Sequence, residues 1–228
     1  MRFNISNSFP KLWAKDLSLY FDDAIAPVFT GLDLSVDAGQ ILAIHGANSS
    51  GKSSLINCLC GIIPKSIRGN VNGEVLVGKQ ALTEIPLCEI SRLMSVAVAD
   101  AQSMLLMPTV ELEIAFALEN KGLEPQIIRE RIAQAASRFG LMNMLPLAPQ
   151  KLSGGEQRLL LFAMCDALQN PILLLDEPET GLSANALELL VAWLKTLRNE
   201  GKAIVLSSHN PQLISLADNQ IKLDKVYV

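Results

Sequence analysis

Residues 40–55 read QILAIHGANSSGKSSL, and this stretch decides the fold. Its apolar start is followed by the pattern GxxxxGK[ST], whose fixed positions are filled by Gly46, Gly51, Lys52 and Ser53. Glycines let main-chain N–H groups curve around phosphate oxygens, and the N-terminus of a following helix favours an anion. The stretch therefore predicts a strand, a phosphate-binding loop and a helix in succession.

The residues of this loop have separate expected roles. We expect Lys52 to reach the β- and γ-phosphates of a nucleotide and the Ser53 hydroxyl to bind Mg²⁺. The candidate nucleotide-binding residues of the loop are Gly46, Ala47, Asn48, Ser49, Ser50, Gly51, Lys52, Ser53 and Ser54.

Acidic residues follow a second apolar run. Residues 171–185 read PILLLDEPETGLSAN, so Asp176, Glu177 and Glu179 come in quick succession after ILLL. In P-loop proteins a second strand ends in a carboxylate that holds the magnesium shell, and Asp176 suits that role. Glu177 is placed to orient and deprotonate an attacking water. Glu179 has no role in this scheme, and we expect it to be solvated.

Composition narrows the class of protein. The chain has 228 residues, of which 50% are hydrophobic and 18% charged, as is typical of one globular domain. Its net charge of −4 disfavours nucleic acid as a partner, and none is expected. No apolar run approaches the roughly 20 residues that span a bilayer, and the N-terminal sequence lacks the apolar region of a signal peptide. The cysteines have no zinc-site or CxxC spacing, so we expect buried or idle thiols in a reducing cytosol at Cys58, Cys60, Cys88 and Cys165.

The pattern of apolar residues gives the expected order of elements. The expected strands are 17–21, 32–36, 40–44, 95–99, 172–176 and 203–208, with a hairpin arm at 69–79. The expected helices lie within 51–61, 110–144 and 152–168. Strands that alternate with helices predict an α/β core, to which the early β-rich and middle helical segments are additions.

A second glycine motif, LSGGEQ at residues 152–157, begins a predicted helix. Ser153 and Glu156 fit the capping box S-x-x-E, in which each side chain bonds the other residue's N–H group. Capping does not require Gly154 and Gly155, which weaken a first helical turn. Two glycines beside free N–H groups therefore indicate a second anion-binding helix end.

LSGGEQ, with the phosphate loop upstream and LLLDEP downstream, resembles the ATP-binding-cassette (ABC) ATPases over nearly the whole chain. The resemblance implies an α/β fold, with a P-loop NTPase, RecA-like core, an antiparallel β lobe and an inserted α-helical lobe. It implies a single domain over residues 1–228, with the β lobe and P-loop core at about 15–80, the helical lobe at about 103–152, and the signature helix and rest of the core at about 153–228. It also implies an ATP hydrolase that uses ATP and Mg²⁺.

The same resemblance implies roles for further residues. In the family, LSGGE binds the γ-phosphate of ATP held by a second cassette, head to tail, in a homodimer or heterodimer. The residues that would serve a partner's ATP are Ser153, Gly154, Gly155 and Glu156. His209, in SSHN, resembles the switch histidine that contacts the γ-phosphate, which makes it the second catalytic candidate beside Glu177. The alternative is an ordinary histidine at a strand end, and His45 is expected to be structural.

Two family positions have alternatives in this chain. An aromatic side chain usually stacks on adenine, and Phe21 is the candidate, with Tyr20 or simple core packing as alternatives. Ungapped spacing puts Ala99 at the position of a glutamine that binds magnesium and senses membrane subunits. A shortened loop restores Gln102 to that position, and we assign the nucleotide and metal role to Gln102.

Two residues depart from the family pattern. Ser49 replaces a usual glycine of the phosphate loop, which is tolerable if its backbone torsions allow a serine. Ser183 replaces the aspartate that follows GL in the family. Together with the open glutamine position, these departures lead to the hypothesis that this subunit works beside a non-identical, more standard cassette.

A narrower resemblance, in GIIPKSIRGNVNGEVLVG (61–78) and PTVELEIAFALENKGL (108–123), is to the ATPase subunits of energy-coupling-factor (ECF) importers. It implies a peripheral protein on the cytoplasmic face of the cell membrane. Such a subunit powers uptake of a vitamin or metal ion through separate integral membrane subunits. The alternatives are a soluble ABC ATPase that acts in DNA repair or on ribosomes, and a weakly active regulatory cassette.

Overall fold

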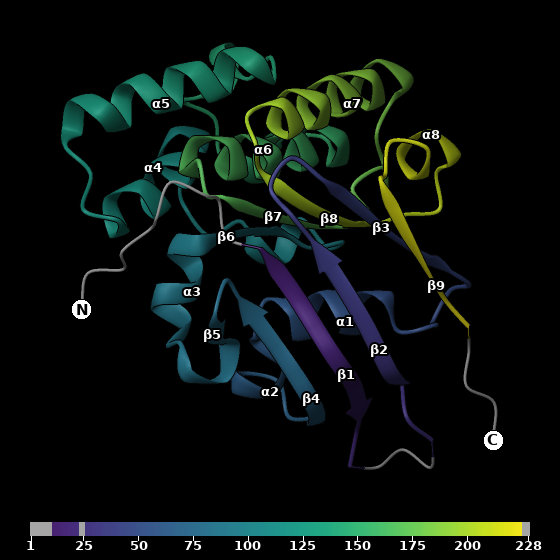
Figure 1. Ribbon diagram of the computed structural model, residues 1–228. Coiled ribbons are helices and arrows are strands. Elements are labelled where there is room, and N and C mark those ends of the chain that lie inside the picture. Colours follow the sequence, from purple (N-terminus) through teal and green to yellow (C-terminus); the bar gives the residue numbers. More distant parts are fainter. Residues whose placement is uncertain (1–10, 23–25, 225–228) are drawn as a thin grey trace.

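The computed structural model describes residues 11–22 and 26–224, which two β-sheets organise (Figure 1). The first sheet is parallel, in the order β6-β7-β8-β3-β9: Met94–Ala97, Ile172–Asp176, Ala203–Ser207, Ile41–Gly46 and Asn219–Leu223. The second is antiparallel, in the order β2-β1-β4-β5: Phe29–Val36, Leu12–Tyr20, Asn70–Val77 and Gln80–Ala81. The predicted α/β core with an antiparallel β lobe is confirmed.

Strands β7 and β8 form the interior of the parallel sheet because they are apolar along almost their whole length. Both are buried at every residue, as expected of strands covered on both faces. Their register pairs Asp176 with Ser207, and β3 lies on the other side of β8 with Ile44 opposite Ser207. The carboxyl ends of β3, β7 and β8 therefore meet at one edge of the sheet, where open α/β sheets bind ligands.

The two faces of the parallel sheet pack into separate cores. Leu173 and Leu175 of β7 face a cluster that includes α6 (Gly154–Leu168) and α7 (Ala184–Asn199). Ile172 and Leu174 face the cluster that holds α1 (Lys52–Leu59) and the antiparallel sheet. In Figure 1, α6 and α7 accordingly lie above the parallel sheet, and α1 lies below it. This alternation follows from the two-residue period of a strand.

A helical lobe packs on α6. It consists of α4 (Val110–Asn120), α5 (Pro125–Arg138) and a 3₁₀ turn, Met142–Met144, so the helical stretch expected at 110–144 is divided. Gly122 adopts a φ of +71° between α4 and α5, which ends the first helix. The remaining helices are α2 (Ile62–Lys65), α3 (Leu87–Leu93) and α8 (Pro211–Ile214). None of the helices in the described part of the chain is long and apolar enough to span a membrane.

Three cations cover the C-terminal end of α6 and join the helical lobe to the core. Lys121 Nζ donates to the carbonyl oxygen of Leu168 at 2.9 Å and to the side chain of Asn170 at 2.5 Å. Arg131 and Lys202 donate to neighbouring carbonyl oxygens. Positive charges at this end of α6 interact favourably with the helix dipole. Burial and the nearby positive charges nevertheless lower the pKa of Lys121 from 10.5 to about 8.

Candidate functional site

Three loops meet at the carboxyl edge of the parallel sheet, after β3, β7 and β8. The N–H group of Glu177 donates to the carbonyl oxygen of Ser207 at 3.1 Å, and that of Ser208 donates to Ile44 at 3.0 Å. These main-chain bonds hold the loops side by side. The edge therefore brings together the phosphate loop, the acidic residues and His209.

The phosphate loop requires glycine at two positions. At Gly46, φ is +151°, and an added Cβ would lie 2.1 Å from the carbonyl oxygen of Leu223. At Gly51, the residue before α1, φ is +96°, and the added atom would lie 2.6 Å from a methyl group of Val28. A side chain fits neither place, so glycine lets the loop pack closely against its neighbours.

The loop presents N–H groups without acceptors. Within 11–22 and 26–224, no residue accepts a hydrogen bond from the N–H groups of Ala47, Asn48, Ser49 or Gly51. The first N–H groups of α1 add to them, because a helix start has no intrahelical acceptors. The hydroxyl of Ser50 is also buried, with no partner among the described residues. This row of donors fits an anion such as the phosphates of a nucleotide.

Lys52 is a buried cation that faces this loop. It is 4% exposed, and its Nζ lies 3.4 and 3.3 Å from the carbonyl oxygens of Gly46 and Ala47. A third neighbour is Oε1 of Glu177, also at 3.4 Å. These distances are long for hydrogen bonds. Burial of a charged group is costly unless hydrogen bonds compensate it, so a closer partner would stabilise the Lys52 ammonium group. A phosphate oxygen held by the loop would be such a partner.

Ser49, at a position where the family usually has glycine, has a left-handed backbone conformation. Its φ is +61°, in the left-handed region, where an L side chain costs roughly 1–2 kcal/mol. The loop therefore accommodates the serine at the cost of local strain.

Ser207 positions both acidic residues that follow β7. Its Oγ donates to Oδ1 of Asp176 at 2.5 Å and accepts the N–H of Glu177 at 2.9 Å. Ser207 was not predicted, although a polar residue at the end of the apolar strand AIVLS was an available signal. The carboxylate of Asp176 and the exposed hydroxyl of Ser53 are oxygen ligands of the kind that Mg²⁺ prefers, so they fit a magnesium site.

Glu177 lies between a lysine and a histidine. Its Oε1 is 3.4 Å from Nζ of Lys52 and 3.4 Å from Nε2 of His209. The side chain of His209 is 43% exposed, so the ring is accessible from outside the chain. Glu177 has a φ of +44°, which is uncommon for a residue with a side chain and is concentrated at functional positions.

The expectation that Glu179 is solvated is wrong. Its Oε1 accepts hydrogen bonds from the Ser208 hydroxyl at 2.6 Å and from the N–H groups of His209 and Asn210 at 2.8 and 3.2 Å. Its Oε2 is buried, with no hydrogen-bond partner in the described part of the chain. The donors lie 29 to 31 residues further along the sequence, so no local pattern could indicate them.

The motif LSGGEQ starts α6 with the predicted capping box. The N–H and hydroxyl of Ser153 both donate to Glu156 at 2.7 Å, which lowers the pKa of that carboxyl. An added Cβ at Gly155 would approach the carbonyl oxygen of Gly181 to 3.2 Å, whereas at Gly154 it would meet nothing within 4 Å. Contacts within the described residues therefore do not explain Gly154, which keeps the prediction of an external ligand open.

Arg158, on α6, fixes the chain that leaves β6. It is 4% exposed, and its guanidinium donates to the carbonyl oxygen of Val98 at 2.6 Å and to that of Ala99. Burial lowers the pKa of Arg158, while the charges of Asp176 and Glu179, among others, oppose that effect. Arg158 was not predicted, because only the fold brings α6 to this loop.

The glutamine position stays a prediction. Gln102 begins a 3₁₀ turn, Gln102–Met104, and its exposed side chain makes no hydrogen bond to the residues that the structure describes. Ala99 lies closer along the chain to β6 and is held through its carbonyl oxygen by Arg158. The contacts of Gln102 and Ala99 therefore do not show which of the two occupies the family's glutamine position.

The remaining candidates have structural contacts. Phe21 is half-buried against the core cluster that holds α1, whereas Tyr20 is 36% exposed, so the aromatic position also stays open. Ser183 caps α7, because its side chain accepts the N–H of Ala186 at 3.3 Å. His45 is half-buried within β3.

Fold and site together define a P-loop nucleotide-binding protein. The sequence profile of the ABC transporter family matches residues 29–180. The chain is 35% identical over 199 residues to PF0068 of Pyrococcus furiosus, which is named as an ABC transporter ATP-binding protein, and the match covers 86% of this chain and 74% of that protein. It is 30% identical over 203 residues to the energy-coupling factor transporter ATP-binding protein EcfA of Methanothermobacter thermautotrophicus, over 88% of this chain and 63% of that protein.

The chain therefore belongs to the ABC transporter family. The fold agrees with that of the dimeric structure of MJ0796, a bacterial ABC transporter cassette, with a TM-score of 0.82 at 22% identity over 93% of this chain and 94% of that one. Some relatives are longer: the chain spans 63% of the Methanothermobacter EcfA and 43% of a Treponema denticola relative that is 27% identical.

Proposed function

We propose that this chain is the ATP-binding and ATP-hydrolysing subunit of an ECF-type importer, which powers uptake of a vitamin or metal ion through separate membrane subunits. The observation that carries the catalytic part is the meeting of Lys52, Glu177 and His209 at one sheet edge, beside Asp176. The ECF assignment is supported by the similarity to the Methanothermobacter EcfA and by the resemblance within 61–78 and 108–123.

Each residue of the site has a chemical task in this proposal. The loop N–H groups and Lys52 bind the phosphates, and Ser53, Asp176 and Gln102 hold Mg²⁺, which neutralises phosphate charge when bound. His209 contacts the γ-phosphate. Glu177 orients the attacking water and takes its proton. Because a γ-phosphate competes with Glu177 for Lys52, nucleotide binding frees the carboxylate for that task.

A second cassette completes the site in this proposal. Ser153 and Gly154 lie at the exposed start of α6, and the open space at Gly154 suits the close approach of a partner's γ-phosphate. A head-to-tail pair would place two such ends over two ATP molecules. Ser183, at a position where the family has aspartate, supports a partner that is not identical to this chain.

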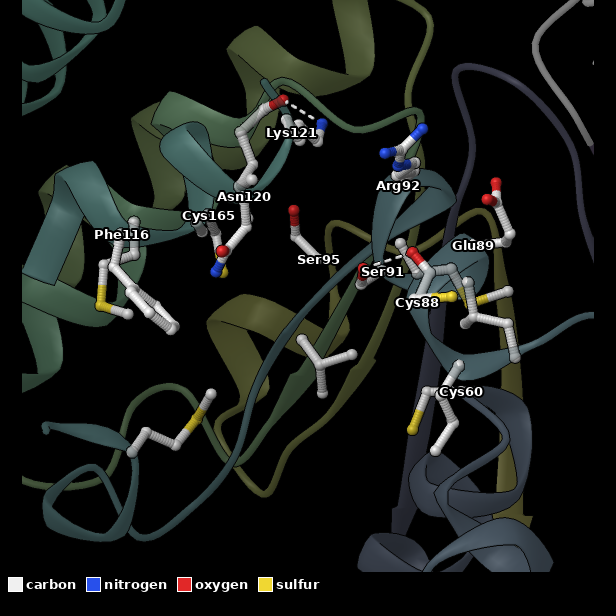
Figure 2. Close-up of a pocket in the computed structure, with 18 of the residues that line it drawn as sticks. Cys60, Cys88, Glu89, Ser91, Arg92, Ser95, Phe116, Asn120, Lys121 and Cys165 are labelled. Carbon is white, nitrogen blue, oxygen red and sulfur yellow. Dashed lines mark hydrogen bonds between the residues drawn. The ribbon is translucent and has the colours of Figure 1, made fainter. Parts of the chain in front are cut away.

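An apolar groove supports a membrane partner. A cavity of about 690 Å³ lies between α3 and β6 on one side and α4 and α6 on the other (Figure 2). Leu87 and Phe116, which are 38% and 44% exposed, line it together with Met104. Met104 shares a turn with Gln102, so a segment inserted here would touch the loop that leads to the nucleotide site. Exposed apolar grooves of this kind mark protein interaction sites.

Co-purification from gently solubilised membranes tests this function. A tagged chain should recover a second cassette and small integral membrane proteins, which would place it at the cytoplasmic face of the membrane. Phe116→Asp should reduce recovery of the membrane proteins, whereas Met142→Asp, at a 47% exposed side chain outside the groove, should not. Recovery of ribosomal or DNA-repair proteins with no membrane protein would contradict the importer and favour a soluble ABC ATPase. ATP binding without turnover in the intact complex would favour a regulatory cassette.

A further inference from the structure

A single carboxylate oxygen holds three consecutive residues after β8. Oε1 of Glu179 accepts the Ser208 hydroxyl at 2.6 Å, the His209 N–H at 2.8 Å and the Asn210 N–H at 3.2 Å. Hydrogen bonds to an ionised carboxylate are stronger than those between neutral groups. The main chain on both sides of the His209 side chain is thereby fixed from the loop that follows β7.

Helix capping does not account for this arrangement. Asn210 caps α8 with its own side chain, which accepts the Gln212 N–H at 2.8 Å. The Asn210 N–H has a second acceptor in the hydroxyl of Ser208, at 2.9 Å. The N–H groups of Asn210 and Gln212 therefore have acceptors without Glu179, so capping of α8 does not require this carboxylate.

The His209 side chain depends on its backbone for its position. Its side chain is 43% exposed, and its polar contact within the described part of the chain is the 3.4 Å approach of Nε2 to Oε1 of Glu177. An exposed side chain with one long contact is weakly held by its surroundings. Glu177 therefore meets the ring of residue 209 while Glu179, two positions further, anchors its main chain.

We propose that Glu179 is a positioning residue, which holds the loop 208–210 so that His209 faces Glu177 and a bound γ-phosphate. This inference rests on the proposed function, in which His209 contacts that phosphate. Its physical basis is the steep dependence of catalysis on geometry, since a displacement of about 1 Å can reduce a rate by as much as 10²-fold.

Three variants separate positioning from a structural role. Glu179→Ala removes the acceptor, Glu179→Gln keeps a carbonyl oxygen without the charge, and Ser208→Ala removes one donor but leaves both main-chain bonds. In the assembled ATPase we expect Glu179→Ala to lower kcat about tenfold or more with the KM for ATP within about twofold of the wild type. Glu179→Gln should recover most of that loss, and Ser208→Ala should have a small effect.

Histidine NMR gives a readout that does not require turnover. The chain has two histidines, His45 and His209, so the imidazole signals of the purified chain are few and a His209→Asn sample assigns them. We expect Glu179→Ala to shift and broaden the His209 signal while the His45 signal stays unchanged as a fold control. In Glu179→Gln the His209 signal should resemble that of the wild type, because the amide oxygen still holds the loop 208–210. Such a result would show that the signal reports the position of the His209 ring and not the charge of residue 179.

The outcomes distinguish this inference from the proposed function. A His209 signal and a kcat in Glu179→Ala equal to the wild type would overturn the positioning role, as would equal effects of Ala and Gln. Absence of ATP turnover in the wild-type complex would instead overturn the proposed function, whatever the NMR signals show. If Glu179→Ala does not fold, the test uses the kcat values of Glu179→Gln and Ser208→Ala. A larger decrease of kcat in Ser208→Ala than in Glu179→Gln would contradict the proposal.

Discussion

Oε1 of Glu177 lies 3.4 Å from Nζ of Lys52, although Glu177 follows β7 and Lys52 begins α1, after the loop that follows β3. The contact joins the acidic loop to the phosphate loop. Lys52 is almost wholly buried, and its polar partners are this carboxylate and two carbonyl oxygens at distances that are long for hydrogen bonds. A phosphate that replaces Glu177 as the partner of Lys52 would couple nucleotide binding to release of the proposed general base.

Replacement of Lys52 by methionine should weaken ATP binding by about tenfold to a hundredfold, because a charge-assisted contact to phosphate is worth roughly 1.5–3 kcal/mol. Methionine keeps most of the buried stem, so the fold should survive. Titration with a fluorescent ATP analogue measures the effect. Lys195→Met, at an exposed lysine of α7, is the matched control, and equal affinities in the two variants would contradict the role of Lys52.

Replacement of Ser49 by glycine should stabilise the nucleotide-free chain by about 0.5–1 kcal/mol, since relief of left-handed strain exceeds the added entropy of the unfolded glycine. The urea midpoint of unfolding reports the change. Ser54→Gly is the control, because Ser54 lies within α1 and is not among the described residues with a positive φ, so glycine there should lower stability. A lower midpoint for Ser49→Gly than for the wild type would show that the serine makes a compensating contact.

Lys121 should make the free energy of unfolding increase with pH between about 8 and 10.5. Its pKa in the folded chain is lowered to about 8 by burial and by the charges of Arg131, Lys202 and Arg92. Between these values the unfolded chain binds more protons than the folded chain, so raising the pH favours folding. Denaturant unfolding at several pH values measures this dependence.

At high pH the buried thiols make the free energy of unfolding decrease, which opposes the effect of Lys121. The measurement must therefore separate the contribution of Lys121 from that of the thiols. Burial raises the pKa of Cys58 and Cys165 to about 12 and that of Cys60 to about 11, so they weaken folding above pH 9. The difference between wild type and Lys121→Met cancels the thiols. The free energy of unfolding of the wild type should increase relative to that of Lys121→Met as the pH rises from 8 to 10.5. A difference between the two free energies that does not change with pH would contradict the assignment.

Thiol alkylation near neutral pH should modify Cys88 alone. The other three cysteines are buried with raised pKa values, and the thiolate is the reactive form. Mass spectrometry should find one modified thiol in the native chain, four after denaturation and none in native Cys88→Ser. Because Cys88 lines the groove between α3 and α4, a bound membrane subunit should protect it. Native modification at Cys165 would show that the groove opens further than the structure describes.

The sequence predicted those features whose cause is local. The loop Gly46–Ser53, the capping box at Ser153 and the apolar strands that became β7 and β8 are set by residues within a few positions of one another. Gly46 and Gly51 illustrate the reason, since their backbone geometry admits no side chain and leaves a visible pattern. Helix α7 was not predicted, although its apolar residues recur on one face.

Features that depend on residues far apart in the chain could not be predicted. Glu179 was expected to be solvated because its acceptor role depends on three donors after β8. Arg158 holds Val98 and Ala99 through contacts between α6 and the chain after β6, which no spacing indicates. The helical stretch 110–144 divides at Gly122, where a single glycine can interrupt a helix or be tolerated in it.

ATP hydrolysis by a Glu177→Gln variant in the assembled complex tests the central claim most directly. Glutamine keeps the shape of the side chain and removes the base, so binding of ATP should persist while release of phosphate falls by about 10²-fold or more. Wild-type complex and the Lys52→Met variant, measured in parallel, separate lost chemistry from lost binding. Phosphate release by Glu177→Gln at the wild-type rate would contradict the assignment of Glu177 as the residue that activates water.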